Sequence, residues 1–276
     1  MNLPLPQRLG DWLRGLSRPP RGGGGRRVTL EATEWTDLRR RVPFIRTLNT
    51  AEAERLRERI EGLLGSKEFV GIDHEPEPWQ CHVIAAYAAL PVLELGLEPY
   101  RDWHTVLIYP DTFVPDHEWV DEDGIVHRGA MPQAGEAWER GPVILSWNDV
   151  LEHGAVVVHE VTHILDGGNG DVNGFPPLPR DRDPAAWTAA FSEAWEWFNT
   201  RVDAPGVSED DLPLDPYAAT APEEFLAVAA EAFFFEPDRL RRDLPAVYEE
   251  MAGYFRQQPH RRAAAVATSI PEPRPT

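Results

Sequence analysis

Apolar residues recur at helical spacing in the first third of the chain. Leu56, Ile60 and Leu63 lie three to four positions apart, with Leu64 directly after them. Thr50 precedes them as a candidate N-cap, which predicts a helix near residues 51–64. The apolar pattern over Trp79–Leu90 predicts a second helix. This part of the fold is therefore expected to be largely helical.

Two short runs rich in β-branched residues have the pattern of strands. Thr105–Tyr109 (TVLIY) and Pro142–Ser146 (PVILS) are each bounded by proline or polar residues, so both predict buried strands. The connection between them is rich in glycine and acidic residues.

Two further helices are predicted in the C-terminal half. Asp183 and Pro184 suit the N-cap and the first helical position of a helix that runs to about Arg201. Another helix is expected to begin at Thr220, which has capping-box spacing to Glu223. Because helices outnumber strands, we expect an α+β fold that is predominantly helical and has a small sheet.

Both ends of the chain have the composition of flexible segments. The run RPPRGGGGRR before residue 28 and the proline-rich IPEPRPT at the C-terminus offer little apolar surface to bury. We therefore expect a flexible leader over 1–29, one folded domain over 30–260 and a flexible proline-rich tail over 261–276.

Charge and composition narrow the classes of partner. The 276 residues carry a formal net charge of −19, which disfavours nucleic acid and anionic membranes as partners because both would be repelled. The chain has one cysteine, no signal-peptide core and no apolar run of membrane-spanning length. We expect a cytoplasmic protein.

The strongest chemical signal is the run His159-Glu160-Val161-Thr162-His163. On a helix, histidines four residues apart lie on one face, where both imidazoles can bind one zinc ion. In zinc hydrolases with this pattern, the glutamate does not bind the metal and acts as general base. The competing interpretation is a helix with two accidental surface histidines. It is disfavoured because valine, isoleucine and leucine surround the motif, so its polar residues need buried partners.

A zinc site with two histidines needs a third protein ligand and one open position. Asp166 stands where a metzincin has glycine, and no third histidine follows, so a later carboxylate is expected. Among Glu223, Glu224 and Glu231 we favour Glu224, because Glu223 is expected to serve the capping box. Glu231, two turns further on, and Asp166 are candidates to orient a ligand histidine. Ordinary solvated carboxylates are the alternative for both.

The remaining histidines have no ligand spacing to one another, and we assign them no role. They are His74, His82, His104, His117, His127, His153 and His260. The aromatic run Phe233–Phe235 is interpreted as core.

Over about residues 45–255 the chain resembles the Mlc titration factor A family of bacterial zinc metallopeptidases, also called glucose-regulated metallopeptidases. That family is related at its catalytic end to the anthrax lethal factor protease domain. The motifs that carry the resemblance are Ile84–Pro91, Val106–Pro110, Gly135–Trp138, Gly141–Trp147, Val158–Asp166, Asn169–Gly170, Pro176–Leu178, Tyr217–Thr220, Glu224–Phe225 and Glu231–Phe234.

The resemblance implies a zincin-like domain of gluzincin type, with the histidine motif on its active-site helix. It implies that His159, His163 and Glu224 bind one zinc ion and that Glu160 is the catalytic base. A tyrosine seven residues before the glutamate ligand faces the metal in such sites, which implies that Tyr217 stabilises the oxyanion. The chain departs from the family at Val161-Thr162, where Phe-Ala is usual, a change that bears on substrate preference more than on ligation.

Three functions are compatible with these residues. The first is hydrolysis of peptide or protein substrates. The second is a regulatory role in which zinc is structural, since the family's namesake sequesters a transcriptional repressor of sugar uptake. The third, a zinc amidase acting on a non-peptide bond, would use the same site residues. The run Pro142–Trp147 resembles the strand that precedes the motif helix, where an edge strand can hold a peptide, and plain core packing is the alternative.

Overall fold

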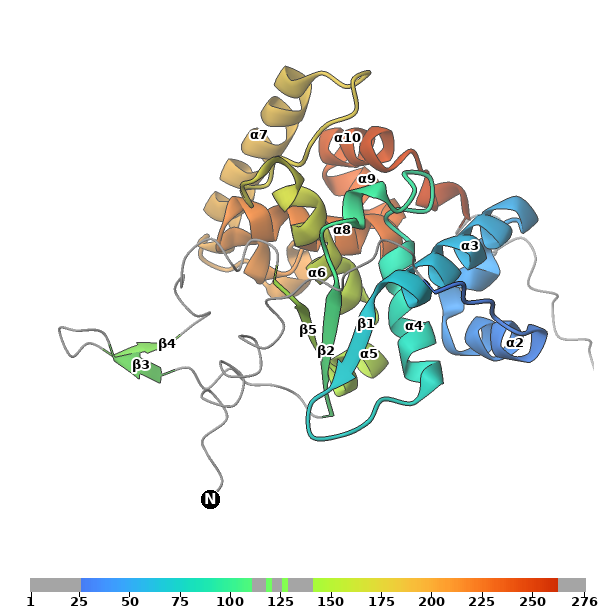
Figure 1. Ribbon diagram of the computed structural model, residues 1–276. Coiled ribbons are helices and arrows are strands. Elements are labelled where there is room, and N and C mark those ends of the chain that lie inside the picture. The colour runs from blue at the N-terminus through green and yellow to red at the C-terminus, as the bar shows by residue number, and fades with distance from the viewer. Residues whose placement is uncertain (1–25, 111–117, 121–125, 129–140, 263–276) are drawn as a thin grey trace, which may run out of the picture.

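The computed structural model describes residues 26–110, 118–120, 126–128 and 141–262. In this part of the chain, three short parallel strands form a sheet in the order β1-β2-β5. The strands are β1 (Glu68–Gly71), β2 (Thr105–Tyr109) and β5 (Val143–Ser146), and helices surround them (Figure 1). The predominantly helical fold with a small sheet is confirmed, and both predicted strands are present. β1 was not predicted, because four residues are too few to show a period.

A second pair of strands, β3 (Glu118–Val120) and β4 (Val126–Arg128), is antiparallel. Both strands belong to the glycine- and acid-rich connection, and the rest of that connection lies largely outside the described residues.

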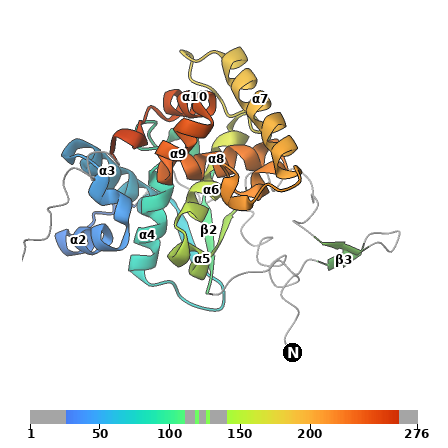
Figure 2. The same ribbon diagram turned by 180° about the vertical axis from the view of Figure 1, so that it is seen from behind.

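Among the described residues, three helices precede the second strand of the sheet. They are α2 (Ala32–Arg41), α3 (Thr50–Ser66) and α4 (Pro78–Ala89). They lie together at one end of the molecule, whereas α7 (Pro184–Val202) lies at the opposite end (Figures 1 and 2). Short 3₁₀ turns at Pro43–Thr47 and Glu98–Tyr100 join neighbouring elements.

The start of α3 differs from the expectation by one residue. Asn49, not Thr50, is the N-cap, and its side chain accepts a hydrogen bond from the Glu52 amide at 3.0 Å. The Glu52 carboxylate accepts in return from the Asn49 amide at 3.0 Å. The reciprocal pair satisfies two backbone donors, which favours asparagine over the adjacent threonine as cap.

The histidine motif lies on α6 (Ala155–Asp166), which follows α5 (Trp147–Glu152) directly after β5. Valine favours strands, yet the valine-rich start of this segment is helical. Val157, Val158 and Val161 are buried, and the helix packs on α8 (Pro222–Phe235). The helix ends at Asp166 with Gly167 as its C-cap, and the 3₁₀ turn Gly167–Asn169 follows. Tertiary burial therefore outweighs the β propensity of valine.

The helix α8 does not begin with the expected capping box. Its N-cap is Ala221, and no side chain caps it. Thr220 instead ends the 3₁₀ turn η5 (Pro216–Ala219), and its hydroxyl donates to the Tyr217 carbonyl at 2.7 Å. The reason for which Glu223 was set aside as a ligand is therefore wrong, although the structure brings Glu224 to the histidines.

The remaining C-terminal elements close the core around α8. They are α7, the 3₁₀ turn η4 (Glu209–Asp211), α9 (Pro237–Asp243) and α10 (Pro245–Phe255). The predicted start of α7 is confirmed, because the Asp183 side chain accepts from the Ala185 amide at 2.9 Å and Pro184 is the first helical residue. None of the described helices combines the length and apolar character needed to cross a bilayer.

The first and last described residues are tied to α3. The amide of Arg26 donates to the Gly65 carbonyl at 3.0 Å, and Arg262 forms a largely buried ion pair with Glu52 at 2.7 Å. Ordered contacts therefore extend a few residues into the expected leader and tail. The other residues of the leader and tail, 1–25 and 263–276, lie outside the described residues.

Candidate metal centre

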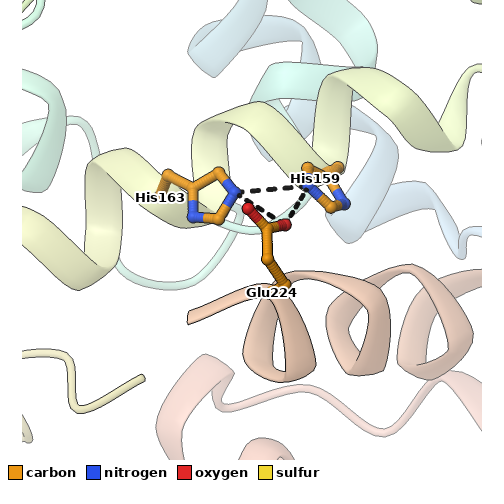
Figure 3. A group of neighbouring side chains, drawn as sticks. All are labelled: His159, His163 and Glu224. Atoms are coloured by element: carbon orange, nitrogen blue, oxygen red, sulfur yellow. Dashed lines mark hydrogen bonds and ion pairs between the residues drawn. The ribbon is translucent and has the colours of Figure 1, made fainter. Parts of the chain in front are cut away.

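Three ligand atoms from two helices converge at the N-terminal part of α8. The Nε2 atoms of His159 and His163 are 3.2 Å apart. Oε2 of Glu224 lies 3.0 Å from the first and 3.5 Å from the second. Figure 3 shows the two imidazoles on α6 facing the carboxylate on α8. The structure thus brings together all three residues expected to bind metal.

The spacing of these atoms fits a tetrahedral zinc ion. Two ligand atoms bound at about 2.0–2.1 Å with a tetrahedral angle lie about 3.3 Å apart. The three observed separations fall on both sides of this value, between 3.0 and 3.5 Å. Two imidazole nitrogens and one carboxylate are also a common donor set for zinc and leave a fourth position open. The residues present therefore fit the ion.

His159 is held by carboxylates on both sides. Its Nδ1 lies 2.7 Å from Oε1 of Glu231, on the face of α8 that also carries Glu224. Burial lowers the pKa of His159, but the hydrogen bonds with Glu224 and Glu231 outweigh burial and raise it to about 10. Burial raises the pKa of Glu224, but the hydrogen bonds and charges of His159 and His163 outweigh burial and lower it to about 2. Without a metal ion, the cluster is a protonated histidine paired with carboxylates.

Asp166 is fully buried one turn after His163 and holds the loop that follows the helix. Its Oδ2 accepts a hydrogen bond from the Gly174 amide at 2.6 Å. Its Oδ1 and the Nδ1 of His163 are both buried without a hydrogen-bond partner among the described residues. The described bond of Asp166 therefore goes to the backbone and not to a ligand histidine.

Glu160 lies beside the converging ligands and lines a cleft. Among the described residues, none forms a hydrogen bond or ion pair with its carboxylate. Burial raises the pKa of Glu160, and the nearby Glu224 and Glu231 raise it further, against the lowering effect of the two histidines. A carboxylate with a raised pKa is a stronger base than one in water, which suits it to accept a proton.

Tyr217 lies in the 3₁₀ turn η5, next to His159 of α6. Its ring centroid lies 6.1 Å from that of His159, and its side chain is half exposed. The Asp215 carboxylate accepts from the Tyr217 amide at 2.8 Å and so fixes the turn that carries the ring. Burial and the neighbouring Glu224 raise the pKa of Tyr217, so its hydroxyl keeps its proton at neutral pH.

The cleft has a volume of about 1000 Å³ and three walls. One is formed by α5 and the first turns of α6, the second by the segment 209–217, and the third by the end of α8 with the start of α9. Tyr87 of α4 also contributes. His159 and Glu160 therefore face an open cleft.

Several lining residues were not recognised in the sequence. His153, which was assigned no role, and Tyr87 both line the cleft. Phe235, interpreted as core, is partly exposed and lines it too. Local sequence carries no signal for these positions, because the cleft forms only where α4, α6 and α8 meet.

Two imidazoles and a carboxylate are the donor set that several zinc metallopeptidases use. The chain belongs to the family of glucose-regulated metallo-peptidases M90, whose family model matches residues 24–256. Membership in this family implies a bound metal ion, for which His159, His163 and Glu224 form a candidate site.

The chain is also similar to curated proteins that share one name, Mlc titration factor A. It is 37% identical over 225 residues to that of Yersinia enterocolitica, covering 79% of this chain and 83% of the relative. It is 36% identical over 233 residues to that of Serratia proteamaculans, covering 82% and 87% of the two chains.

Proposed function

We propose that the protein is a zinc-dependent peptidase that hydrolyses peptide bonds with a water molecule. The observation that carries this proposal is the convergence of His159, His163 and Glu224 at zinc-ligand spacing, with the unpaired Glu160 beside them in an open cleft. The chemistry that zinc supplies when bound is Lewis acidity, which polarises a carbonyl group and acidifies water.

The chain's own residues have distinct roles in this proposal. Glu160 accepts a proton from the attacking water and later donates it to the leaving amine. The Tyr217 hydroxyl donates a hydrogen bond to the carbonyl oxygen as that oxygen gains negative charge. Glu231 accepts a hydrogen bond from Nδ1 of His159, which leaves Nε2 free to bind metal.

The end of the sheet is suited to hold a substrate backbone. Among the described strands, β5 is at the edge of the order β1-β2-β5, and it leads through α5 to the histidine helix. An edge strand offers unpaired amide and carbonyl groups to which an extended peptide can bind. We assign β5 this role in substrate binding.

Metal analysis beside peptide-library cleavage tests the proposal. The purified protein should contain about one zinc ion per chain and cleave peptides. Glu160→Gln should retain metal and lose cleavage, and His159→Ala should lose both. Glu223→Gln, next to the ligand on α8, is the matched control and should retain both. If Glu160→Gln cleaved at the parent rate, the mechanism would be wrong.

A second candidate function rests on the name of the relatives, which describes them as titrating Mlc. In this alternative the protein binds a corresponding regulator and zinc serves mainly to hold α6 and α8 together. Loss of fold on zinc removal, with no peptide cleaved when zinc is present, would favour the binding role.

A further inference from the structure

The cleft is lined both by apolar side chains and by several carboxylates. We propose that it selects peptides that carry an arginine or lysine side chain next to the scissile bond, an inference that rests on the proposed peptidase function. Such a side chain has a long apolar stem and a cationic end, so it can use both kinds of surface at once.

The apolar part lies close to the metal centre. Val156 precedes His159 by one turn of α6, on the same side of the helix, and lines the cleft with Tyr87 and Phe235. The rings of Tyr87 and Phe235 are 6.0 Å apart and tilted. Val228 and Ala232 of α8 complete this wall. An aliphatic stem beside the scissile bond would therefore replace water on these surfaces.

The charged part is almost entirely acidic. The carboxylates that line the cleft are Asp149, Glu160, Glu209, Asp210, Asp215, Glu231 and Glu236. Among the described lining residues, Arg239 is the one permanent cation. Its guanidinium is already used, because it pairs with Glu236 at 3.2 Å and donates to the carbonyls of Asp210 and Leu212.

The apolar wall and the lining carboxylates together favour a substrate side chain that has an apolar stem and a cationic end. The converging metal ligands and the unpaired Glu160 fix where the scissile bond must lie. A neutral apolar side chain would fill the apolar wall but would gain nothing from the excess of negative charge in the cleft. An acidic side chain would be repelled, since a cleft lined by one sign of charge concentrates the field within it.

Matched peptides test the proposal. Peptides that differ only in the residue next to the cleaved bond, which is lysine, leucine or glutamate, are compared by kcat/KM with zinc-loaded protein. We expect the lysine peptide to exceed the glutamate peptide by about tenfold. The preference should shrink when the salt concentration is raised from 0.05 M to about 1 M, because salt screens exposed charges.

Charge-removing variants locate the preference in the cleft. The double variant Glu209→Gln/Glu236→Gln should reduce the lysine-to-glutamate ratio by about threefold. The double variant Glu54→Gln/Glu58→Gln removes the same charge from exposed positions of α3 outside the cleft and should leave the ratio unchanged. An equal effect of the two double variants would assign the preference to net charge and overturn the proposal.

A binding measurement separates this inference from the peptidase function. Fluorescence anisotropy with labelled lysine and glutamate peptides is recorded on zinc-loaded Glu160→Gln protein. Tighter binding of the lysine peptide, with no cleavage by the parent, would support the charge preference and refute the peptidase function. Cleavage of all three peptides at one rate, with equal binding, would refute the charge preference alone.

Discussion

Oε1 of Glu231 lies 2.7 Å from Nδ1 of His159, and this contact joins α8 to α6 across 72 positions of the chain. In the neutral imidazole this contact favours the proton on Nδ1, so that Nε2, which lies 3.0 Å from Glu224, can bind metal. One helix therefore supplies both a candidate metal ligand and the residue that orients another ligand.

Replacing Glu231 should weaken metal binding without removing a ligand. For Glu231→Ala we expect zinc affinity to fall about 10- to 100-fold, because the imidazole loses its orientation and part of its basicity. Glu231→Gln, which retains a hydrogen-bond acceptor, should lose less. Competition with a fluorescent chelator measures both constants, with Glu223→Gln as control. An unchanged affinity in Glu231→Ala would rule out the orienting role.

Removing the Tyr217 hydroxyl should slow the chemical step alone. For Tyr217→Phe we expect kcat to fall about 10²- to 10³-fold, the effect of losing one oxyanion donor. Zinc content and KM should stay close to those of the parent, because the half-exposed ring remains in place. Steady-state kinetics with a cleaved library peptide measures this split. A rise in KM with constant kcat would instead assign Tyr217 to substrate binding.

Metal uptake should compete with a proton on His159. In the metal-free protein its pKa is about 10, because the bonds to Glu224 and Glu231 outweigh burial. A metal ion binds neutral imidazole, so at pH 7 it must displace that proton. We expect zinc affinity to rise about tenfold per pH unit between pH 6.5 and 8.5. An affinity that stayed constant over this range would contradict the prediction.

The same group makes the stability of the metal-free protein depend on pH. Because the pKa in the folded state is higher than the unfolded value of about 6.5, the folded state binds more protons between these values. This contribution to stability is therefore complete below pH 6.5 and is lost as pH rises through about 10. Urea unfolding of the metal-free parent should show this loss, and His159→Gln should lack it.

The approach of Tyr87 to Gly154 leaves no room for a side chain. A Cβ at Gly154 would lie 2.0–2.4 Å from three carbons of the Tyr87 ring, which also packs against Phe44 and Phe235. We expect Gly154→Ala to lower the free energy of unfolding by about 1–3 kcal/mol, the usual cost of overpacking.

A double-mutant cycle identifies the cause of that loss. If the ring is responsible, Gly154→Ala should cost much less when Tyr87 has already been changed to alanine, because the two residues are in contact. Denaturant unfolding of the four proteins measures the coupling. Additive losses would mean that the glycine is needed for the backbone and not for the ring.

The local patterns in the sequence predicted much of the fold. The strand Thr105–Tyr109 was predicted with its observed bounds, and the helix after Asp183 begins as expected. The errors concern helix caps, where neighbouring residues compete for the same backbone hydrogen bonds. Asn49 replaced Thr50 as a cap because it forms a reciprocal pair with Glu52, and Thr220 closes a 3₁₀ turn instead of capping α8.

The sequence by itself identified His159 and His163 as a candidate pair of metal ligands, because residues four positions apart lie on one face of a helix. It also determined the net charge and the helical character of the chain. Only the tertiary structure decided that Oε2 of Glu224 lies within 3.5 Å of both histidines and that Glu231 supports one of them. It also decided that Tyr87 and Phe235 line a cleft together with carboxylates from each of its three walls. These relationships depend on how distant helices pack, and no local periodicity encodes that packing.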